Sequence, residues 1–208
     1  MVWKTKRLFN PISLGLILIG IIAISSNPGL AASTITVEAD SFSYSDRDQT
    51  DGTGYVDYVG TSGNDHKFEI SASKGAWDNG GEAIIEFDGS YTVSEAAMYD
   101  LKVYWILNGE IDWGTNCWAE IEIAVREKTG IGGTWSSWYT KTIDDEQNYS
   151  EESIYQWALA KNRSPGNTYY VDVRFTASAG GSWLAFDSVA DFDGSNWVKF
   201  DKILVVPS

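Results

Sequence analysis

Two carboxylates in the first predicted strand have the spacing of a cation site. Glu38 and Asp40 are two residues apart, so on a strand both side chains leave the same face, ~7 Å apart. Carboxylates at that separation repel one another unless a cation lies between them, and Ca²⁺ takes about 6–8 oxygen ligands at about 2.3–2.6 Å. The pattern therefore indicates either a calcium site or solvated acids at a sheet edge.

Tryptophan is the other residue type whose placement points to chemistry. Sugars present C–H faces that stack on flat rings, and their hydroxyls bond to neighbouring polar groups. Exposed aromatic rings beside polar side chains are therefore typical of a sugar site. The alternative is that the rings fill the ends of a small core. Five of the ten tryptophans fall in segments rich in Gly, Ser, Asn and Asp, namely Trp113, Trp135, Trp138, Trp183 and Trp197.

A single His and a single Cys exclude several kinds of site. A Cys/His zinc site, an internal disulfide and a Cys–Cys redox pair each need more of these residues than one chain supplies. A Ser-His-Asp triad would have to use His66, and no G-x-S-x-G motif lies near it. Nothing marks two of the many carboxylates as the acid and base of a glycosidase. We therefore do not expect an enzyme.

Charge excludes a further class of partner. The chain has 29 Asp and Glu against 15 Lys and Arg, and residues 1–32 contain three of the bases and no acid. Residues 33–208 therefore carry 29 acids and 12 bases, a net charge of −17. Such a charge repels phosphate backbones, so nucleic acid is not an expected partner.

Residues 1–32 have the three parts of a secretory signal peptide. Residues 1–7 are basic, residues 8–24 are mostly apolar, and residues 30–32 are small enough for cleavage. The apolar part is shorter than the ~20 residues of a membrane-spanning helix, which favours cleavage near Ala32 or Ser33 over an uncleaved anchor. We therefore expect a secreted, extracellular or cell-surface protein without a stable membrane anchor after cleavage.

Residues 33–208 are predicted to form one all-β domain. Apolar and polar residues alternate with a period of two, without a competing 3.6-residue stripe, along segments 35–40, 83–88, 99–105, 119–126 and 169–175. One apolar and one polar face per strand, with Gly/Asp/Asn/Ser turns between strands, predicts an antiparallel β-sandwich or jelly roll.

Three segments fall outside this alternation. Ser150–Ala160 is the one plausible helical turn and could equally be loop. The acidic segments 46–52 and 191–196 lack the spacing of an EF-hand loop, so they are predicted to be Asx-rich turns.

Six segments share their order and spacing with one known family. They are Thr36-Val37-Glu38-Ala39-Asp40, Gly54-Tyr55-Val56-Asp57-Tyr58-Val59, Ala97-Met98-Tyr99-Asp100-Leu101-Lys102-Val103, Gly132-Gly133-Thr134-Trp135-Ser136-Ser137-Trp138, Pro165-Gly166-Asn167-Thr168 and Val198-Lys199-Phe200-Asp201-Lys202-Ile203. Together they resemble the carbohydrate-binding modules of families 6 and 35, which are galactose-binding-like β-sandwiches. Met98 departs from the pattern, because the family usually has Gly there.

The resemblance implies a sugar site built from loop aromatics. Tyr58 and Trp138 would flank the sugar ring, with Trp135 as a neighbour. Asn196 or Lys199 would supply the polar contact. Lys199 lies near where the family usually has a sugar-binding Asn, and a lysine there would favour acidic sugars such as uronates.

The resemblance also extends the cation site. It places the last strand beside the first, so Asp201 would join Glu38 and Asp40 around a structural Ca²⁺.

These features predict a secreted, non-catalytic module that binds a polysaccharide or glycan and is stabilised by calcium. The alternative is an extracellular structural or surface-assembly protein, such as a matrix, S-layer-associated or filament subunit, that contacts other surface proteins. Exposed aromatics also serve protein interfaces. Binding modules usually accompany enzymes, which favours this alternative for a module that follows its own signal peptide.

Overall fold

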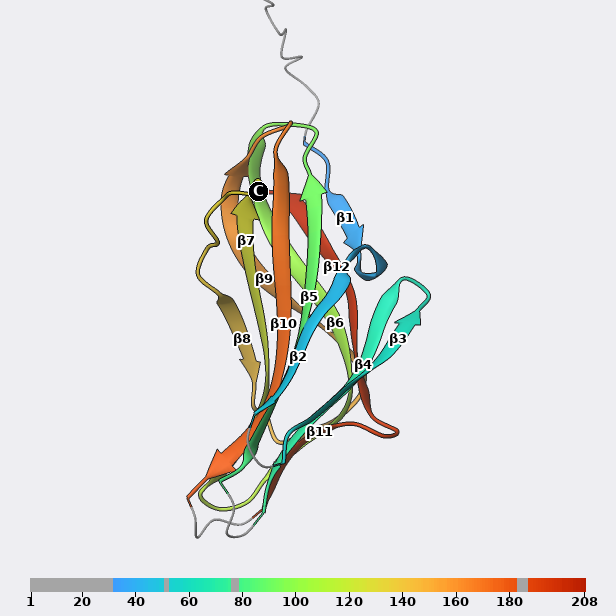
Figure 1. Cartoon of the computed structure of the whole chain (residues 1–208), viewed down its shortest axis with the longest axis vertical. Helices are drawn as coiled ribbons and strands as arrows, with labels where there is room; N and C mark the ends of the chain where they lie inside the picture. The colour runs from blue at the N-terminus through green and yellow to red at the C-terminus, as the bar shows by residue number, and fades with distance from the viewer. Residues whose placement is uncertain (1–31, 51–52, 76–78, 183–186) are drawn as a thin grey trace, which may run out of the picture. The chain divides into compact units, whose positions relative to one another are not determined.

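Two antiparallel β-sheets pack face to face in the computed structural model of this protein, which describes residues 32–50, 53–75, 79–182 and 187–208 (Figure 1). Within these ranges, only the backbone is described for residues 46–50, 62 and 156–158. The predicted signal peptide lies outside the described residues except for Ala32, and Trp183 lies outside them too. Ala32–Ser208 forms one compact unit. Within the described ranges, no helical segment has the length and apolarity that a membrane crossing requires.

The first sheet, which we call sheet A, has seven strands in the described part of the chain. They are β1 (Ile35–Glu38), β3 (Tyr55–Ser62), β4 (Asp65–Lys74), β6 (Ala97–Trp113), β9 (Gln147–Arg163), β11 (Ser188–Phe192) and β12 (Trp197–Pro207). Their order is β1-β12-β4-β11-β6-β9, with β3 paired to β4 and β12 also paired to β6. Glu38 lies opposite Lys202, so the predicted adjacency of the first and last strands is confirmed.

The second sheet, sheet B, has the strand order β2-β5-β10-β7-β8. Its strands are β2 (Ser43–Thr50), β5 (Gly81–Thr92), β7 (Cys117–Thr129), β8 (Tyr139–Ile143) and β10 (Thr168–Gly181). A 3₁₀ turn, Ala39–Ser41, leads from β1 in sheet A to β2 in sheet B. The central strand β10 is paired with β5 on one side and β7 on the other along almost its whole length (Figure 1).

The alternation seen in the sequence places one core between the sheets. On β7, Ala119, Ile121 and Ile123 are buried, while the residues between them face outward. Full burial of a large apolar side chain contributes about 1.5–3 kcal/mol, so the central aromatic rings hold the two sheets together. These fully buried, mutually packed rings come from both sheets: Phe68, Phe87, Trp105, Phe175 and Phe200. The predicted antiparallel β-sandwich is therefore confirmed.

Two local predictions were wrong. Segment Ser150–Ala160 is neither helix nor loop but part of β9, which pairs with β6. Its register shifts twice, and Glu151 and Leu159 adopt positive φ angles of 52° and 50° at these irregularities. A bulge moves the following side chains to the other face, which hides the alternation that identifies a strand. Of the predicted turn at 46–52, residues 46–50 likewise belong to β2, and residues 51–52 lie outside the described residues.

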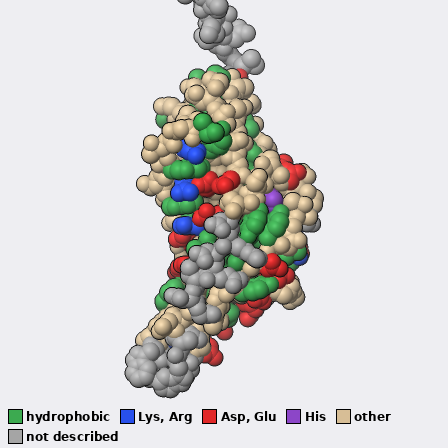
Figure 2. All heavy atoms as spheres, viewed as in Figure 1, with side chains coloured by type: hydrophobic (Ala, Val, Ile, Leu, Met, Phe, Trp, Pro, Cys, Tyr) green, Lys and Arg blue, Asp and Glu red, His purple; other side chains and the backbone are tan. Residues whose placement is uncertain are grey.

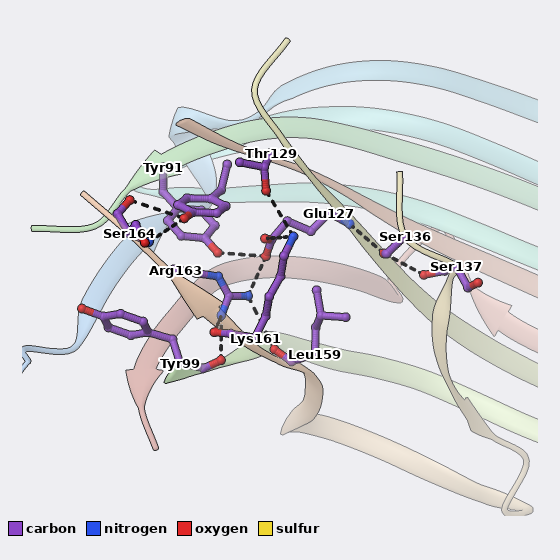
Figure 3. Close-up of polar contacts among 11 residues, drawn as sticks. Tyr91, Tyr99, Glu127, Thr129, Ser136, Ser137, Leu159, Lys161, Arg163 and Ser164 are labelled. Carbon is purple, nitrogen blue, oxygen red and sulfur yellow. Dashed lines mark hydrogen bonds and ion pairs between the residues drawn. The ribbon is translucent and has the colours of Figure 1, made fainter. Parts of the chain in front are cut away.

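A buried ion pair joins the two sheets near one end of the sandwich. Nη2 of Arg163, on β9 of sheet A, lies 2.6 Å from Oε2 of Glu127, on β7 of sheet B, and neither side chain is more than 1% exposed. Figure 3 shows the guanidinium and the carboxylate pointing toward one another between the strands. Nη1 of Arg163 also donates to the carbonyl of Tyr99 at 2.6 Å.

Neighbouring donors complete the coordination of the Glu127 carboxylate (Figure 3). The hydroxyl of Tyr91 donates to Oε2 at 2.9 Å, and Nζ of Lys161 donates to Oε1 at 3.3 Å. Burial raises the pKa of Tyr91, and the nearby Glu127 charge raises it further, so the phenol stays protonated and remains the donor. Each charge of the pair therefore has partners that offset the cost of removing it from water.

We predict that Glu127→Gln lowers the free energy of unfolding by about 3–5 kcal/mol, because it leaves the Arg163 charge buried without its counterion. Urea denaturation measures this loss. The matched control is Glu86→Gln, because Oε1 of Glu86 lies 3.8 Å from Nη1 of Arg174 in an ion pair in which each side chain is 26% exposed. A partly exposed pair contributes less than about 1 kcal/mol. Equal losses for the two variants would contradict a structural role for the buried pair.

Candidate functional site

Charged residues cover the outer face of sheet B, which we call the sheet-B face. Asp172 on β10 lies opposite Asp88 on β5 and opposite Arg126 on β7. Nε of Arg126 donates to Oδ2 of Asp172 at 2.6 Å, and the Asp172 side chain is only 5% exposed. Strand pairing thus brings together side chains that are far apart in the sequence.

A short loop is folded onto this face after β7. Gly130 turns the chain with a φ of 71°, a conformation that favours glycine, and the amide of Gly133 donates to the carbonyl of Gly130. Ser136 then pairs back onto β7, because its amide donates to the carbonyl of Glu127 and its hydroxyl accepts from the Glu127 amide. The loop therefore returns along the strand and places two tryptophans beside the outward side chains of β7.

The two tryptophans form an alternating column with three bases. Nζ of Lys128 lies 4.3 Å from the ring centre of Trp135, and the guanidinium carbon of Arg126 lies 4.7 Å from the same ring. Trp138 has the guanidinium carbons of Arg126 and Arg174 at 4.3 and 4.4 Å. Figure 2 shows basic and hydrophobic side chains alternating over β7 and β10, beside acidic ones. Each cation–π contact contributes about 0.5–1 kcal/mol at an exposed site, so the column holds the indoles in place.

A solvent-open hollow of about 350 Å³ lies beside this column, and we call it the Trp135 hollow. An aromatic ring, acceptors and fixed donors surround the same space. The lining residues are Ser45, Glu86, Asp88, Gly89, Arg126, Lys128, Trp135, Tyr170 and Asp172.

The charge state of Asp172 is set by its position in this hollow. Burial and a hydrogen bond with Asp88 raise the pKa of Asp172 to about 7, although Arg126 acts in the opposite direction. Near neutral pH, Asp172 is therefore partly protonated, and its proton lies between it and Asp88.

Of the predicted sugar-binding residues, Trp135 and Trp138 come together and Tyr58 does not join them. The Tyr58 ring stacks on Tyr44 at 5.0 Å, and its hydroxyl lies 2.7 Å from Nδ1 of His66. His66 is buried, and its Nε2 lies 2.8 Å from the carbonyl of Phe42. Since that carbonyl only accepts, Nε2 of His66 carries a proton and donates to it. The predicted pairing of Tyr58 with Trp138 is therefore wrong.

Asn196 and Lys199 lie on the other sheet. Asn196 closes the turn before β12, where its backbone amide donates to the carbonyl of Asp193 at 2.8 Å. The turn predicted for segment 191–196 is thus confirmed after residue 192, whereas Asp191 and Phe192 belong to β11. Nζ of Lys199 lies 3.1 Å from Oδ2 of Asp65 and 5.4 Å from the ring of Trp197. The predicted set is thus divided between the two sheets, and the Lys199 charge is already paired.

The predicted calcium ligands do not fit a metal site as they stand. β1 ends at Glu38, and Asp40 lies in the following 3₁₀ turn, so the two are not on one strand as predicted. Nζ of Lys202 lies 3.1 Å from Oδ2 of Asp201, and Asp201 and Glu38 both raise the pKa of Lys202. In the described ranges, no three or more His, Cys, Asp or Glu side chains form a group that could hold a metal ion.

Sequence reasoning missed the polar part of the Trp135 hollow. The sequence did mark these residues as polar positions of alternating strands, namely Glu86, Asp88, Arg126 and Asp172. It did not show that β5 and β7 both pair with β10, and this pairing brings the polar positions together on one surface.

Comparisons with known proteins give likeness in architecture only. No protein-family model matches the chain, and no curated protein matches it. A Podospora anserina GH26-CBM35 β-(1,4)-mannanase aligns over 86% of this chain and 28% of its own, with 14% identity and a TM-score of 0.31. A family 35 carbohydrate-binding module from Clostridium thermocellum aligns over 83% of this chain and 98% of its own, with 13% identity and a TM-score of 0.30.

Two further structures belong to the same comparison. TmCBM61 in complex with β-1,4-galactotriose aligns over 79% of this chain and 90% of its own, with 12% identity and a TM-score of 0.28. The chain spans 28% of the mannanase and 20% of the enzymatically active domain of bacteriophage CBA120 tailspike protein 4. The fold described above rests on the strands and registers of this chain alone.

We predict that wild-type stability falls relative to that of Asp172→Asn as the pH rises from about 4 to about 7. The pKa of the Asp172 carboxyl is about 3.9 in the unfolded chain and about 7 in the folded protein. Between these values the folded state binds more protons than the unfolded state, so a rise in pH favours unfolding. Urea denaturation of both proteins across this pH range measures the difference. A constant difference would show that the fold does not hold the proton on Asp172.

Proposed function

We propose that this protein is a secreted, non-catalytic carbohydrate-binding module and that the Trp135 hollow is its binding site. The observation that carries the proposal is a half-buried indole held at the side of an open hollow that is otherwise lined mostly by hydrogen-bonding side chains. A sugar has an apolar C–H face and a rim of hydroxyls, so it needs a flat ring and polar partners in the same place.

The polar groups of the hollow suit uncharged hydroxyls. A hydroxyl both donates and accepts, so it can donate to the carboxylates of Glu86 and Asp88 and accept from Arg126 or Lys128. Arg126 is fixed in place by its 2.6 Å bond to Asp172. Groups that are already oriented lose little freedom on binding, and this strengthens an otherwise weak polar contact.

Trp138 serves this site as a positioning residue. Its ring contacts Arg126 and Arg174, and it does not line the Trp135 hollow. By holding Arg126 from one side while Trp135 contacts it from the other, Trp138 fixes the wall of the hollow.

We predict that Trp135→Ala weakens polysaccharide binding by about 2 kcal/mol, roughly thirtyfold, because aromatic anchors typically dominate such contacts. Affinity electrophoresis in hydroxyethylcellulose, galactomannan, xylan and polygalacturonate gels measures this loss. The matched control is Trp197→Ala, since Trp197 is also half-buried and also flanked by two bases, Lys67 and Lys199, but belongs to sheet A.

The control also separates the two candidate surfaces. If Trp197→Ala abolishes retention and Trp135→Ala does not, the site lies on the Asn196–Lys199 side of sheet A. Concentration-dependent assembly of the wild type, with no retention in any gel, would instead favour the structural alternative.

Secretion and calcium binding complete the proposal. Export is supported by the three-part pattern of residues 1–32. A calcium ion at Glu38, Asp40 and Asp201 requires the ammonium of Lys202 to leave Asp201.

The calcium proposal predicts that excess Ca²⁺ raises the melting temperature by mass action, since the ion would bind the folded state alone. Asp201→Ala should remove most of that rise. Thermal melts with Ca²⁺ and with EDTA provide the measurement. Identical wild-type melting curves would contradict the site and leave Lys202 as the cation that offsets Asp201 and Glu38.

A further inference from the structure

A second exposed tryptophan lies on the sheet-B face, toward the other end of β7. Trp118 and Arg126 both point outward in the alternation of β7. Trp118 is 47% exposed. Register pairs Trp118 with Gly180 and Arg126 with Asp172 on β10. Eight residues of strand separate the two positions, a distance of about 26 Å at ~3.3 Å per residue.

The residue opposite Trp118 is a glycine because of the indole. A Cβ on Gly180 would lie 2.6 Å from Cζ2 of Trp118, closer than packed atoms approach. Gly180 has no left-handed backbone angle that would itself require glycine. The indole therefore lies over bare backbone on β10, which holds it in place and leaves nearly half of its surface in solvent.

A solvent-open hollow of about 300 Å³ adjoins this ring, and we call it the Trp118 hollow. Like the Trp135 hollow, it places an aromatic ring beside a carboxylate and a hydroxyl, although it has no basic side chain in its lining. The lining residues are Asn79, Gly80, Gly81, Glu82, Trp118, Ser178 and Ala179.

Polar groups continue along β10 between the two hollows. Thr176 and Ser178 occupy outward positions of β10, where each is only 8% exposed, and the Ser178 hydroxyl donates to Glu120 at 3.3 Å. Farther along, the outward side chain of Arg174 has its guanidinium carbon 4.4 Å from the centre of the Trp138 ring.

The charge of the sheet-B face selects against acidic sugars. Carboxylates outnumber bases on the outward positions of β5, β7 and β10. Beside the partly protonated Asp172, the carboxylates are Glu82, Glu86, Asp88, Glu120 and Glu122, and the bases are Arg126, Lys128 and Arg174. Like charges brought together in a binding site repel, so a polyuronate is disfavoured and an uncharged chain is accepted.

We propose that Trp118 is a second aromatic subsite and that the ligand is an extended, uncharged polysaccharide chain lying along β10 between Trp118 and Trp135. This inference rests on the proposed function, because it assigns a ligand class and a length to the same site. A chain that reaches both rings gains the second contact without a second association cost, so affinity rises with ligand length.

Isothermal titration with β-1,4-linked gluco-, manno- and xylo-oligosaccharides, each as disaccharide and hexasaccharide, tests the subsite. We expect the wild type to bind a hexasaccharide at least tenfold more tightly than the matching disaccharide. Trp118→Ala should remove most of this advantage, so that the two lengths bind with nearly equal affinity. The matched control is Tyr155→Ala, an aromatic residue of equal exposure (48%) on sheet A, which should change neither affinity.

A second variant, Gly180→Ala, tests the same subsite if Trp118→Ala does not fold. Gly180→Ala keeps the indole but displaces it from β10, so it should reproduce the effect of Trp118→Ala on the hexasaccharide. Near-UV circular dichroism confirms that each variant is folded.

Several outcomes overturn the inference, and they differ from failure of the proposed function. Equal wild-type affinity for both lengths, or a hexasaccharide advantage that survives in Trp118→Ala and Gly180→Ala, removes the second subsite while carbohydrate binding stands. Tighter binding of polygalacturonate than of every neutral polymer overturns the ligand class. Absence of binding to any of these probes contradicts the proposed function itself.

Discussion

The buried ion pair of Glu127 and Arg163 is the interaction on which the candidate site depends. The Glu127 side chain points into the core and ties β7 to β9, while its backbone holds Ser136 of the aromatic loop. The residues on either side of Glu127, Arg126 and Lys128, point outward because side chains alternate along a strand. One short stretch of β7 thus joins the sheets, anchors the loop and supplies the bases that contact the indoles.

That arrangement has a consequence for recognition. The cations that surround Trp135 and Trp138 restrict the motion of both rings before any ligand arrives. Ordering a side chain at a binding surface costs about 0.5–1.5 kcal/mol, and here much of that cost is met during folding. Each ring has two such basic neighbours, but only Trp135 also lines the open hollow, which is why the proposal assigns it the sugar contact.

The sequence predicted the sandwich because its apolar residues alternate along β5, β6, β7 and β10. Where the register of β5 or β6 shifts within the predicted segment, the extra residue lies in the partner strand, so the alternation is kept. It did not reveal β9, where two bulges with Glu151 and Leu159 at positive φ interrupt the alternation. The loop tryptophans were identifiable as candidates because Trp135 and Trp138 lie among Gly and Ser residues.

The contacts of the other site residues depend on which strands pair. Tyr58 contacts Tyr44 and His66, and Asp172 lies opposite Asp88 and Arg126. The local alternation of residues does not encode these strand pairings.

The central claim is that carbohydrate binds the sheet-B face, and the indole N–H resonances of ¹⁵N-tryptophan-labelled protein test it most directly. Titration with a neutral β-1,4-linked hexasaccharide should shift the signals of Trp135 and Trp118. The signal of Trp105, buried in the core, and that of Trp197, on sheet A, should not move. Movement of the Trp197 signal with Trp135 and Trp118 unchanged would contradict the account.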